Sequence, residues 1–172
     1  MQKIQNSQQM KAKNYDLDNL DLQILSILMD DSRVTYSQIG KALFVSPGTV
    51  HVRVQKLEQM GVIKRQQIVV DYEKLGYDVT AFIGIYLQKS SLYEEVVTEL
   101  QAMHEVVSIN YTTGNYSMFV KIICRDTNHL KLVLHDKIQH INGIQRTETF
   151  ISLEERANRP VKLLDEEVKI GV

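Results

Sequence analysis

The sequence predicts an α+β protein in two parts, a group of three short helices followed by a βαββαβ sandwich of the ferredoxin-like kind. Three observations support this fold class. Three helix start signals lie within about 45 residues, hydrophobic residues alternate from Val79 onward, and two helical stretches interrupt the alternating segments. With 172 residues, 44% of them hydrophobic, the chain is long enough for two small domains, each with its own core.

Each of the three helices has a recognisable beginning. Asp18 is a good N-cap, and apolar residues follow it at helical spacing as far as Leu28. Thr35, with a glutamine three positions later, forms a capping-box pattern that starts a second, short helix. Ser46 and Pro47 are typical of an N-cap and first helical position. We expect the third helix to run from Pro47 to about residue 60, where Gly61 can form a left-handed cap.

The second part alternates between strands and helices. The order strand, helix, strand, strand, helix, strand predicts a split βαβ sandwich with both helices on one face of an antiparallel sheet. The expected elements are residues 79–87, 92–103, 106–113, 117–124, 128–138 and 143–153. The other face needs a partner, and it contains either Phe82 and Tyr86 or, in the opposite register, Ile83 and Ile85. Either set favours dimerisation. Residues 62–77 are interpreted as two short extended segments, which form either a small wing or a connector.

Composition and charge narrow the functional class. The chain has no apolar run of the roughly 18 residues that cross a membrane and no apolar signal-peptide core, so we expect a cytoplasmic protein without a membrane partner. The net charge is −1, but residues 32–68 hold six basic residues and one acidic residue, a net charge of +5. Such segregation favours a phosphate-facing module, although it is also compatible with a solvated helix face. The single cysteine, Cys124, is expected to be a buried apolar residue.

The third helix is the candidate DNA-binding element. In a helix-turn-helix the last helix lies in the major groove, and here Val50, Val54 and Leu57 are expected to face the core. An ordinary three-helix domain is the alternative. The outward residues suit different contacts: hydroxyl, imidazole and amide groups for base edges, a valine for a thymine methyl, and a lysine for phosphate. The candidate DNA-binding residues are Ser46, Gly48, Thr49, His51, Val52, Arg53, Gln55 and Lys56.

Several segments resemble the Lrp/AsnC family of bacterial and archaeal regulators. Residues 45–65 read VSPGTVHVRVQKLEQMGVIKR and resemble that family's recognition helix, while residues 17–33 resemble its opening helix. LGYDV resembles its linker, and TTGNYSMFVKI with IQRTETFISL resemble its effector-domain hairpin and last strand. The resemblance covers roughly residues 16 to 155. SPGTVHVRV, LGYD and TTGNYS are especially similar to the asparagine-responsive members.

The resemblance implies a winged helix-turn-helix joined to a βαββαβ amino-acid-binding domain. The implied partners are double-stranded DNA, an amino-acid effector and further copies of the chain, as dimers and possibly octamers. No cofactor is implied. We expect a flexible arm at 1–15, the DNA-binding domain at 16–65, a linker at 66–78, the amino-acid-binding and oligomerisation domain at 79–155, and a tail at 156–172.

The resemblance also implies an effector site between subunits, formed by one loop and two threonines of the last strand. These residues are Tyr111, Thr112, Thr113, Gly114, Asn115, Tyr116, Ser117, Thr147 and Thr149. A tight turn with glycine leaves N–H groups free for a carboxylate, and threonines two apart on a strand share a face, although such threonines are usually plain sheet formers.

The chain departs from the family's commonest pattern at Ser117, where an acidic residue is usual. A neutral hydroxyl beside Asn115 suits a neutral polar effector such as asparagine and argues against a basic one.

Other functional classes have weaker support. His129, His135 and His140 are separated by six and five residues, unlike the i, i+4 pair of a helical zinc site, so no metal site is expected. No nucleophile or phosphate loop stands in a catalytic pattern, and we expect no enzymatic activity. Two alternatives to an effector-responsive regulator stay open: an architectural DNA-organising protein without an effector response, and a metabolite-binding subunit that does not touch DNA.

Overall fold

The computed structural model describes residues 16–164, which form two compact units. Residues 16–68 together with 159–164 make the first unit, and residues 69–158 make the second. The expected arm at 1–15 and the last part of the tail lie outside the described residues. The tail expected at 156–172 is therefore divided, because residues 156–158 belong to the second unit and residues 159–164 to the same unit as the three N-terminal helices.

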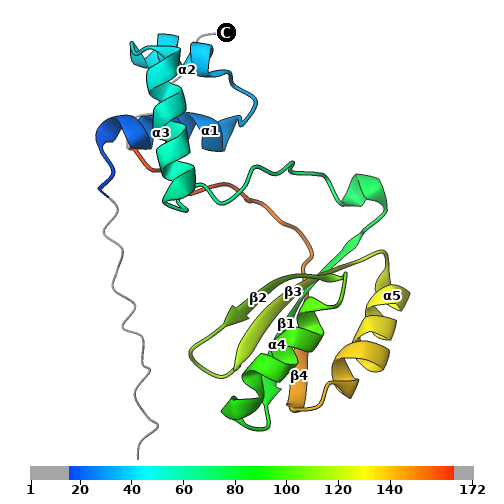
Figure 1. Ribbon diagram of the computed structural model, residues 1–172. Coiled ribbons are helices and arrows are strands. Elements are labelled where there is room, and N and C mark those ends of the chain that lie inside the picture. Colours follow the sequence, from blue (N-terminus) through cyan, green and yellow to red (C-terminus); the bar gives the residue numbers. More distant parts are fainter. Residues whose placement is uncertain (1–15, 165–172) are drawn as a thin grey trace, which may run out of the picture. The chain divides into compact units, whose positions relative to one another are not determined.

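The first unit contains α1 (Asn19–Asp30), α2 (Tyr36–Leu43) and α3 (Pro47–Gln59) (Figure 1). All three predicted N-caps are confirmed. The Asp21 N–H donates to Asp18 Oδ1 over 2.9 Å, the Thr35 and Gln38 groups form a reciprocal capping box, and the Thr49 N–H donates to Ser46 Oγ over 3.0 Å. Each cap satisfies helix N–H groups that would otherwise have no partner.

The end of α3 also follows the sequence prediction. Gly61 has a φ of 72°, in the left-handed region, and the Val62 N–H donates to the Leu57 carbonyl over 2.9 Å. Val50, Val54 and Leu57 are fully or almost fully buried, as predicted. The core of this unit therefore holds α3 in place through one face only, and leaves the opposite face of the helix exposed.

The turn between α2 and α3 depends on two unusual positions. A Cβ on Gly40 would lie 2.7 Å from the Val45 carbonyl oxygen, so the turn passes directly against this glycine. Phe44 ends α2 with a φ of 57°, the one positive value among the described residues other than glycine, and its side chain is 96% exposed. Left-handed backbone at a bulky residue is strained, and nothing in the unit packs on the ring to offset that strain.

The segment after α3 contains little regular structure. No strand forms between Gly61 and Val79; the segment contains only a single 3-10 turn at Glu73–Leu75, closed by Gly76. Of the two interpretations given for this segment, a wing or a connector, the connector agrees with the single chain, which forms no strand here. The reason is physical: Ile68 and Val69 are almost fully exposed, and no neighbouring strand is present to receive their backbone hydrogen bonds.

The second unit has the predicted βαββαβ order. Its antiparallel sheet has the strand order β2-β3-β1-β4, and α4 and α5 cover one face of it (Figure 1). A 3-10 turn at Ser90–Leu92 precedes α4, and α5 continues through a π-helical turn at Val133–Lys137 into a 3-10 turn at Ile138–His140. The elements are β1 (Val79–Leu87), α4 (Tyr93–Gln101), β2 (Val106–Tyr111), β3 (Met118–Cys124), α5 (Thr127–Leu132) and β4 (Ile144–Ile151).

The structure decides the register that the sequence left open. Ile83 and Ile85 are completely buried beneath the helices, in one cluster with Val96 and Leu100. Phe82 and Tyr86 therefore lie on the face away from the helices, because successive residues of a strand point to opposite faces.

That outer face carries an aromatic cluster from three strands. The ring centroids of Phe82 and Phe119 lie 5.7 Å apart, those of Tyr86 and Tyr116 lie 5.2 Å apart, and those of Tyr116 and Phe150 lie 6.2 Å apart. Both tyrosine hydroxyls donate to the Glu148 carboxylate, over 3.2 and 2.8 Å. Phe150 is nearly half exposed. We call this surface the outer aromatic face; among the described residues it lies on the side of the sheet opposite to α4 and α5, with Lys121 over the Phe82 ring and Arg146 over the Tyr86 ring.

Three further observations concern the cysteine, the possible metal-binding groups and the hydropathy of the helices. Cys124 is completely buried in the core of the second unit, and burial raises the pKa of its thiol to about 11. Within residues 16–164, no three histidine, cysteine or acidic side chains are grouped closely enough to hold a metal ion. Among the same residues no helix has the length and hydropathy needed to cross a bilayer.

Candidate DNA-binding surface and effector site

The recognition helix presents the predicted residues outward. Gly48, His51, Val52, Gln55 and Lys56 are exposed. Thr49 and Arg53 are half-buried. The Thr49 and Ser46 hydroxyls share a hydrogen bond of 2.9 Å, which ties the first turn of α3 to its cap. Val52 is 63% exposed, so its methyl groups are accessible to a partner.

Arg53 is held by α1. Its guanidinium donates to the Asp18 carboxylate and, over 3.1 Å, to Oδ1 of Asp21, whose side chain is completely buried. The hydrogen bond from the Asp21 backbone and that from Arg53 lower the pKa of Asp18. The sequence placed Arg53 at the flank of the DNA surface but gave no sign of these partners. In this unit Arg53 therefore connects α3 to the start of α1.

Lys56 is bound more loosely. Its Nζ lies 3.8 Å from Oδ2 of Asp21 and donates to the Asp16 carbonyl over 3.4 Å, while its side chain is 46% exposed. These contacts are long, so the ammonium group can exchange them for a phosphate at little cost.

Removing the Lys56 side chain is expected to affect DNA binding, whereas removing the Arg53 side chain is expected to affect stability. Lys56→Ala should weaken binding evenly across DNA sequences and reduce the slope of log K against log salt by about one, because one phosphate contact is lost. Arg53→Ala should lower the melting temperature, because it leaves the buried Asp21 carboxylate without its guanidinium. Fluorescence anisotropy at several salt concentrations and thermal unfolding measure the two effects. An unchanged salt slope for Lys56→Ala would show that the lysine does not contact phosphate.

The predicted effector loop joins β2 to β3. Its closure is local: Thr112 Oγ1 donates to the Tyr116 carbonyl over 2.8 Å, and the Thr112 N–H donates to the Ser117 carbonyl over 3.2 Å. Gly114 has a φ of 106°, which only glycine adopts without strain. Thr113, Gly114 and Asn115 are exposed at the tip, and none of their N–H groups donates to another described residue. These groups are oriented by the turn and available to an anion.

Ser117 fixes the end of the loop to the sheet. Its N–H donates to the Ile85 carbonyl over 2.9 Å, and its Oγ accepts from the Leu87 N–H over 3.3 Å. Tyr111, at the loop's other end, is 66% exposed and stacks edge-on against Tyr93 with ring centroids 4.8 Å apart. The Ser117 hydroxyl thus has a backbone partner in the sheet and retains one donor for a ligand.

Thr147 and Thr149 lie on β4. They pair with Ile85 and Ile83 on the helix-covered side of β4, one edge of the sheet, whereas β2 forms the other edge. The prediction that both threonines share one face is confirmed by this register. No hydrogen bond joins the two threonines themselves to the loop among the described residues, but the loop residue Tyr116 reaches β4, because its hydroxyl donates to Glu148, between the two threonines, over 2.8 Å.

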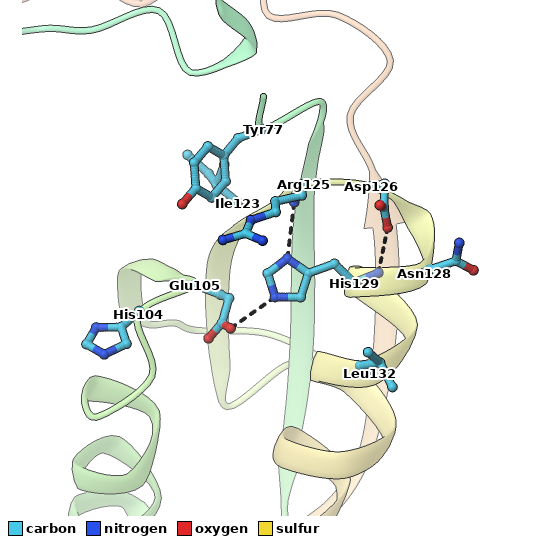
Figure 2. A pocket seen from close by; sticks show the side chains of 9 residues that line it. All are labelled: Tyr77, His104, Glu105, Ile123, Arg125, Asp126, Asn128, His129 and Leu132. Atoms are coloured by element: carbon cyan, nitrogen blue, oxygen red, sulfur yellow. Dashed lines mark hydrogen bonds and ion pairs between the residues drawn. The ribbon is translucent and has the colours of Figure 1, made fainter. Parts of the chain in front are cut away.

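A second cluster of polar residues was missed by the sequence reasoning. At the other end of β3, Glu105 Oε1 accepts from Lys137 Nζ over 2.7 Å and lies 3.1 Å from His129 Nε2 (Figure 2 shows the His129 contact). Burial raises the pKa of Glu105, but hydrogen bonds from Lys137, from the backbone and from His129 outweigh burial and lower it to about 2. These residues are 24 and 32 positions apart, so no local spacing in the sequence signals them.

Glu105 is expected to contribute to stability in a pH-dependent way. A carboxyl whose pKa falls from 4.5 to about 2 on folding stabilises the fold by about 3 kcal/mol above pH 4.5, and this is lost as pH falls toward 2. Glu105→Gln should therefore be less stable than the parent at pH 7, with the difference shrinking in acid. Urea unfolding between pH 7 and 3 measures it. Glu99→Gln, at an exposed position of α4, is the control and should show no such convergence.

Both units match families of known proteins. Residues 17–64 match the winged helix-turn-helix DNA-binding family, and residues 80–161 match the Lrp/AsnC ligand binding domain. The chain is 46% identical over 148 residues to regulatory protein AsnC of Haemophilus influenzae, covering 86% of this chain and 99% of that protein. It is 45% identical over 150 residues to AsnC of Escherichia coli K12, covering 87% and 99%.

Solved structures agree with these matches. The structure of E. coli AsnC superimposes with a TM-score of 0.82 at 44% identity, covering 86% of this chain and 99% of that one. A transcriptional regulator of Neisseria meningitidis in complex with L-Met shares the fold, with a TM-score of 0.80 at 22% identity, covering 83% and 94%.

The fold and its exposed recognition helix thus define a DNA-binding regulator of transcription, with a ligand-binding domain following a winged helix-turn-helix. The relatives named above are regulatory proteins and not enzymes. The chain belongs to the Lrp/AsnC family.

Proposed function

We propose that this regulator responds to a neutral polar amino acid, with asparagine as the favoured effector. The observation that carries the proposal is the chemistry of the β2–β3 loop. Free N–H groups around Gly114 suit the effector's carboxylate, and the neutral Ser117 and Asn115 suit a carboxamide side chain better than a charged one. A protein of the same fold has been crystallised with another neutral amino acid, L-Met.

The effector site is completed between subunits. Thr147 and Thr149 lie on the edge strand β4 and form no hydrogen bond with the loop of their own chain among the described residues, so in this proposal the loop of a second copy completes the site. Two surfaces support self-association: the outer aromatic face and the exposed Ile68 and Val69. Dimers are the basic unit of this proposal, and octamers follow if dimers associate in a closed ring.

DNA recognition is assigned to the exposed side of α3. Thr49, His51 and Gln55 read base edges, Val52 contacts a thymine methyl, and Lys56 binds phosphate. Ser46 and Gly48 bring the start of the helix close to the DNA, and the Arg53 pairing with α1 sets its orientation. The DNA-binding domain corresponds to residues 16–65 and the effector domain to residues 79–155. The protein acts in the cytoplasm, where its DNA target lies.

The test is a thermal-shift panel of the full chain against the twenty amino acids. A ligand at one hundred times its Kd stabilises by about 2.7 kcal/mol, so a true effector gives a clear shift. A selective shift with asparagine is expected, followed by a change in promoter affinity when asparagine is added. A shift with leucine or lysine but none with asparagine would refute the assignment.

The second candidate function is architectural organisation of DNA without an effector response. The exposed, basic recognition unit and the outer aromatic face favour it equally well, because neither requires a ligand. The two functions differ in one measurement: an architectural protein binds DNA with the same affinity with and without any amino acid, since a ligand with equal affinity for both states shifts nothing.

A further inference from the structure

The turn between α2 and α3 carries one almost fully exposed aromatic side chain (Figure 1 shows the two helices). Phe44 is 96% exposed, and its backbone is left-handed, with a φ of 57°. Both features oppose folding, because the ring stays in water and a left-handed backbone favours glycine or asparagine over a bulky residue. The packing of the unit therefore does not explain a phenylalanine at this position.

Backbone contacts hold the turn on both sides of the ring. The Phe44 N–H and the Val45 N–H both donate to the Gly40 carbonyl, the second over 2.9 Å. The Val45 carbonyl oxygen lies so close to Gly40 that an added Cβ would be 2.7 Å from it. The Phe44 side chain therefore projects into solvent from a fixed position before any partner binds, which reduces the entropy cost of a contact.

The exposed ring adjoins the start of the recognition helix. Ser46, Pro47 and Gly48 follow Phe44 closely in the sequence, and all three are exposed. Two residues of chain span at most about 7 Å, so the Phe44 backbone lies within that distance of the N-cap of α3. A Cβ on Gly48 would meet only Ser46 Oγ, at 3.7 Å, so a partner can approach the helix backbone closely here. A partner that contacts the first turn of α3 therefore also comes within reach of the ring.

The charge around the turn favours an anionic partner. The sequence has no aspartate or glutamate from Ser32 to Leu57. Lys41, three positions before Phe44, is exposed on the last turn of α2. A partner that fits this surface carries negative charge and also offers apolar groups. In DNA the phosphates supply the charge, and the thymine methyl groups supply apolar contacts in the major groove.

We propose that Phe44 is a specificity-determining residue of the DNA-binding surface, whose ring packs against a thymine methyl at the edge of the major groove. The contact removes apolar surface of both groups from water, and phenylalanine is one of the side chains that suit this methyl. Val52 lies eight positions further along the chain, so the two apolar residues contact different thymines. The proposal rests on the assignment of α3 to the groove and does not depend on any effector.

Fluorescence anisotropy of the full chain tests the proposal, with a duplex that the chain itself selects from a random-sequence library. Each thymine of this duplex is replaced in turn by deoxyuridine, which lacks the methyl group. At one thymine the replacement should weaken binding by the parent about fourfold, the loss expected for one buried methyl. Phe44→Asn should lose this preference for thymine at that position but keep the preference at the thymine that Val52 contacts. Phe44→Tyr, which retains the ring, should keep both.

The controls separate this contact from changes in folding and in charge. Phe44→Asn should melt at a temperature at least as high as the parent, because asparagine tolerates left-handed backbone better than phenylalanine does. Its slope of log K against log salt should equal the parent's, since the ring carries no charge, whereas Lys56→Ala should reduce that slope. Leu153→Asn removes another apolar side chain, 98% exposed and in the second unit, and should leave DNA affinity unchanged.

Three results would overturn the proposal. Phe44→Asn could bind the selected duplex as tightly as the parent, or it could keep the parent's preference for thymine over deoxyuridine at every position. In the third, Phe44→Asn changes the oligomeric state in sedimentation, because the ring then packs against a second copy of the chain and not against DNA. If Lys56→Ala weakens binding while Phe44→Asn has no effect, the assignment of α3 stands and only the role of Phe44 fails.

Discussion

Gly114→Val is expected to abolish the thermal shift produced by asparagine while leaving DNA binding without effector unchanged. The φ of 106° at Gly114 is accessible to glycine and strained for a β-branched residue, so the loop must change its backbone to accept valine. The N–H groups of residues 113 to 115 then no longer point in the directions that the turn sets. The shift of about 2.7 kcal/mol at one hundred times Kd should disappear. Thermal unfolding with and without asparagine, and anisotropy with promoter DNA, measure both parts.

Gly76→Val is the matched control for this variant. Gly76 has a φ of 81°, and a Cβ at either glycine would meet no heavy atom within 4 Å, so both substitutions create backbone strain in open space. Both should lower the melting temperature, but only Gly114→Val should lose the response to asparagine. If both variants lose it, the loss reflects general destabilisation or failed assembly, and the loop would not be the effector site.

Gly40→Ala is expected to reduce DNA affinity more than tenfold. The added methyl would lie 2.7 Å from the Val45 carbonyl oxygen and 3.3 Å from the Pro47 nitrogen, both of which are backbone atoms that cannot rotate away. The turn must therefore open, and the start of α3 moves with it. Overpacking of this kind costs about 1 to 3 kcal/mol. Urea unfolding gives the loss of stability, and anisotropy gives the loss of affinity.

Ser32→Ala, at an exposed position after α1, is the control for the turn variant and should change neither quantity. A stable Gly40→Ala protein with normal DNA affinity would mean that the α2–α3 turn relaxes without moving the recognition helix. In that case the close passage of the chain at Gly40 would have no role in placing α3.

Local signals in the sequence predicted the helices well. The helix ends depend on local contacts of Asp18, Thr35, Ser46 and Gly61, each within about one turn of its own position. A short segment of the sequence is therefore enough to predict each end. The facing of α3 was predicted for the same reason, because Val50, Val54 and Leu57 repeat with the helical period. The order of strands and helices along the second unit followed from the alternation of apolar residues and the two helical stretches between them.

Features that depend on contacts between residues far apart in the sequence could not be predicted. No local pattern in the sequence marks Asp21, yet its side chain is completely buried, with Arg53 and Lys56 reaching it from α3. The register of β1 was left open because Ile83 and Phe82 are equally apolar, and only the packing of the helices distinguishes them. The segment around Ile68 has the composition of a strand, but strand formation requires a neighbour that the single chain does not supply.

The effector site was predicted in part. The loop closed by Thr112 and Gly114 has the expected turn chemistry, and this could be inferred from residue types alone. That Thr147 and Thr149 lie on the opposite edge strand required the sheet order. The cluster at Glu105 could not be predicted without three-dimensional packing, since His129 and Lys137 are 24 and 32 positions from Glu105 in the sequence.

The burial of Cys124 has a practical consequence for future experiments. The thiolate is the form that reacts with maleimides, and a completely buried thiol with a pKa of about 11 stays protonated and out of reach of the reagent. Since this is the chain's single cysteine, the native protein behaves toward labelling reagents as though it had none. One new cysteine at Glu58 and another at Glu99, both exposed, would accept a pair of dyes without further engineering. Energy transfer between those dyes would report directly whether the two units change their separation when effector or DNA is added.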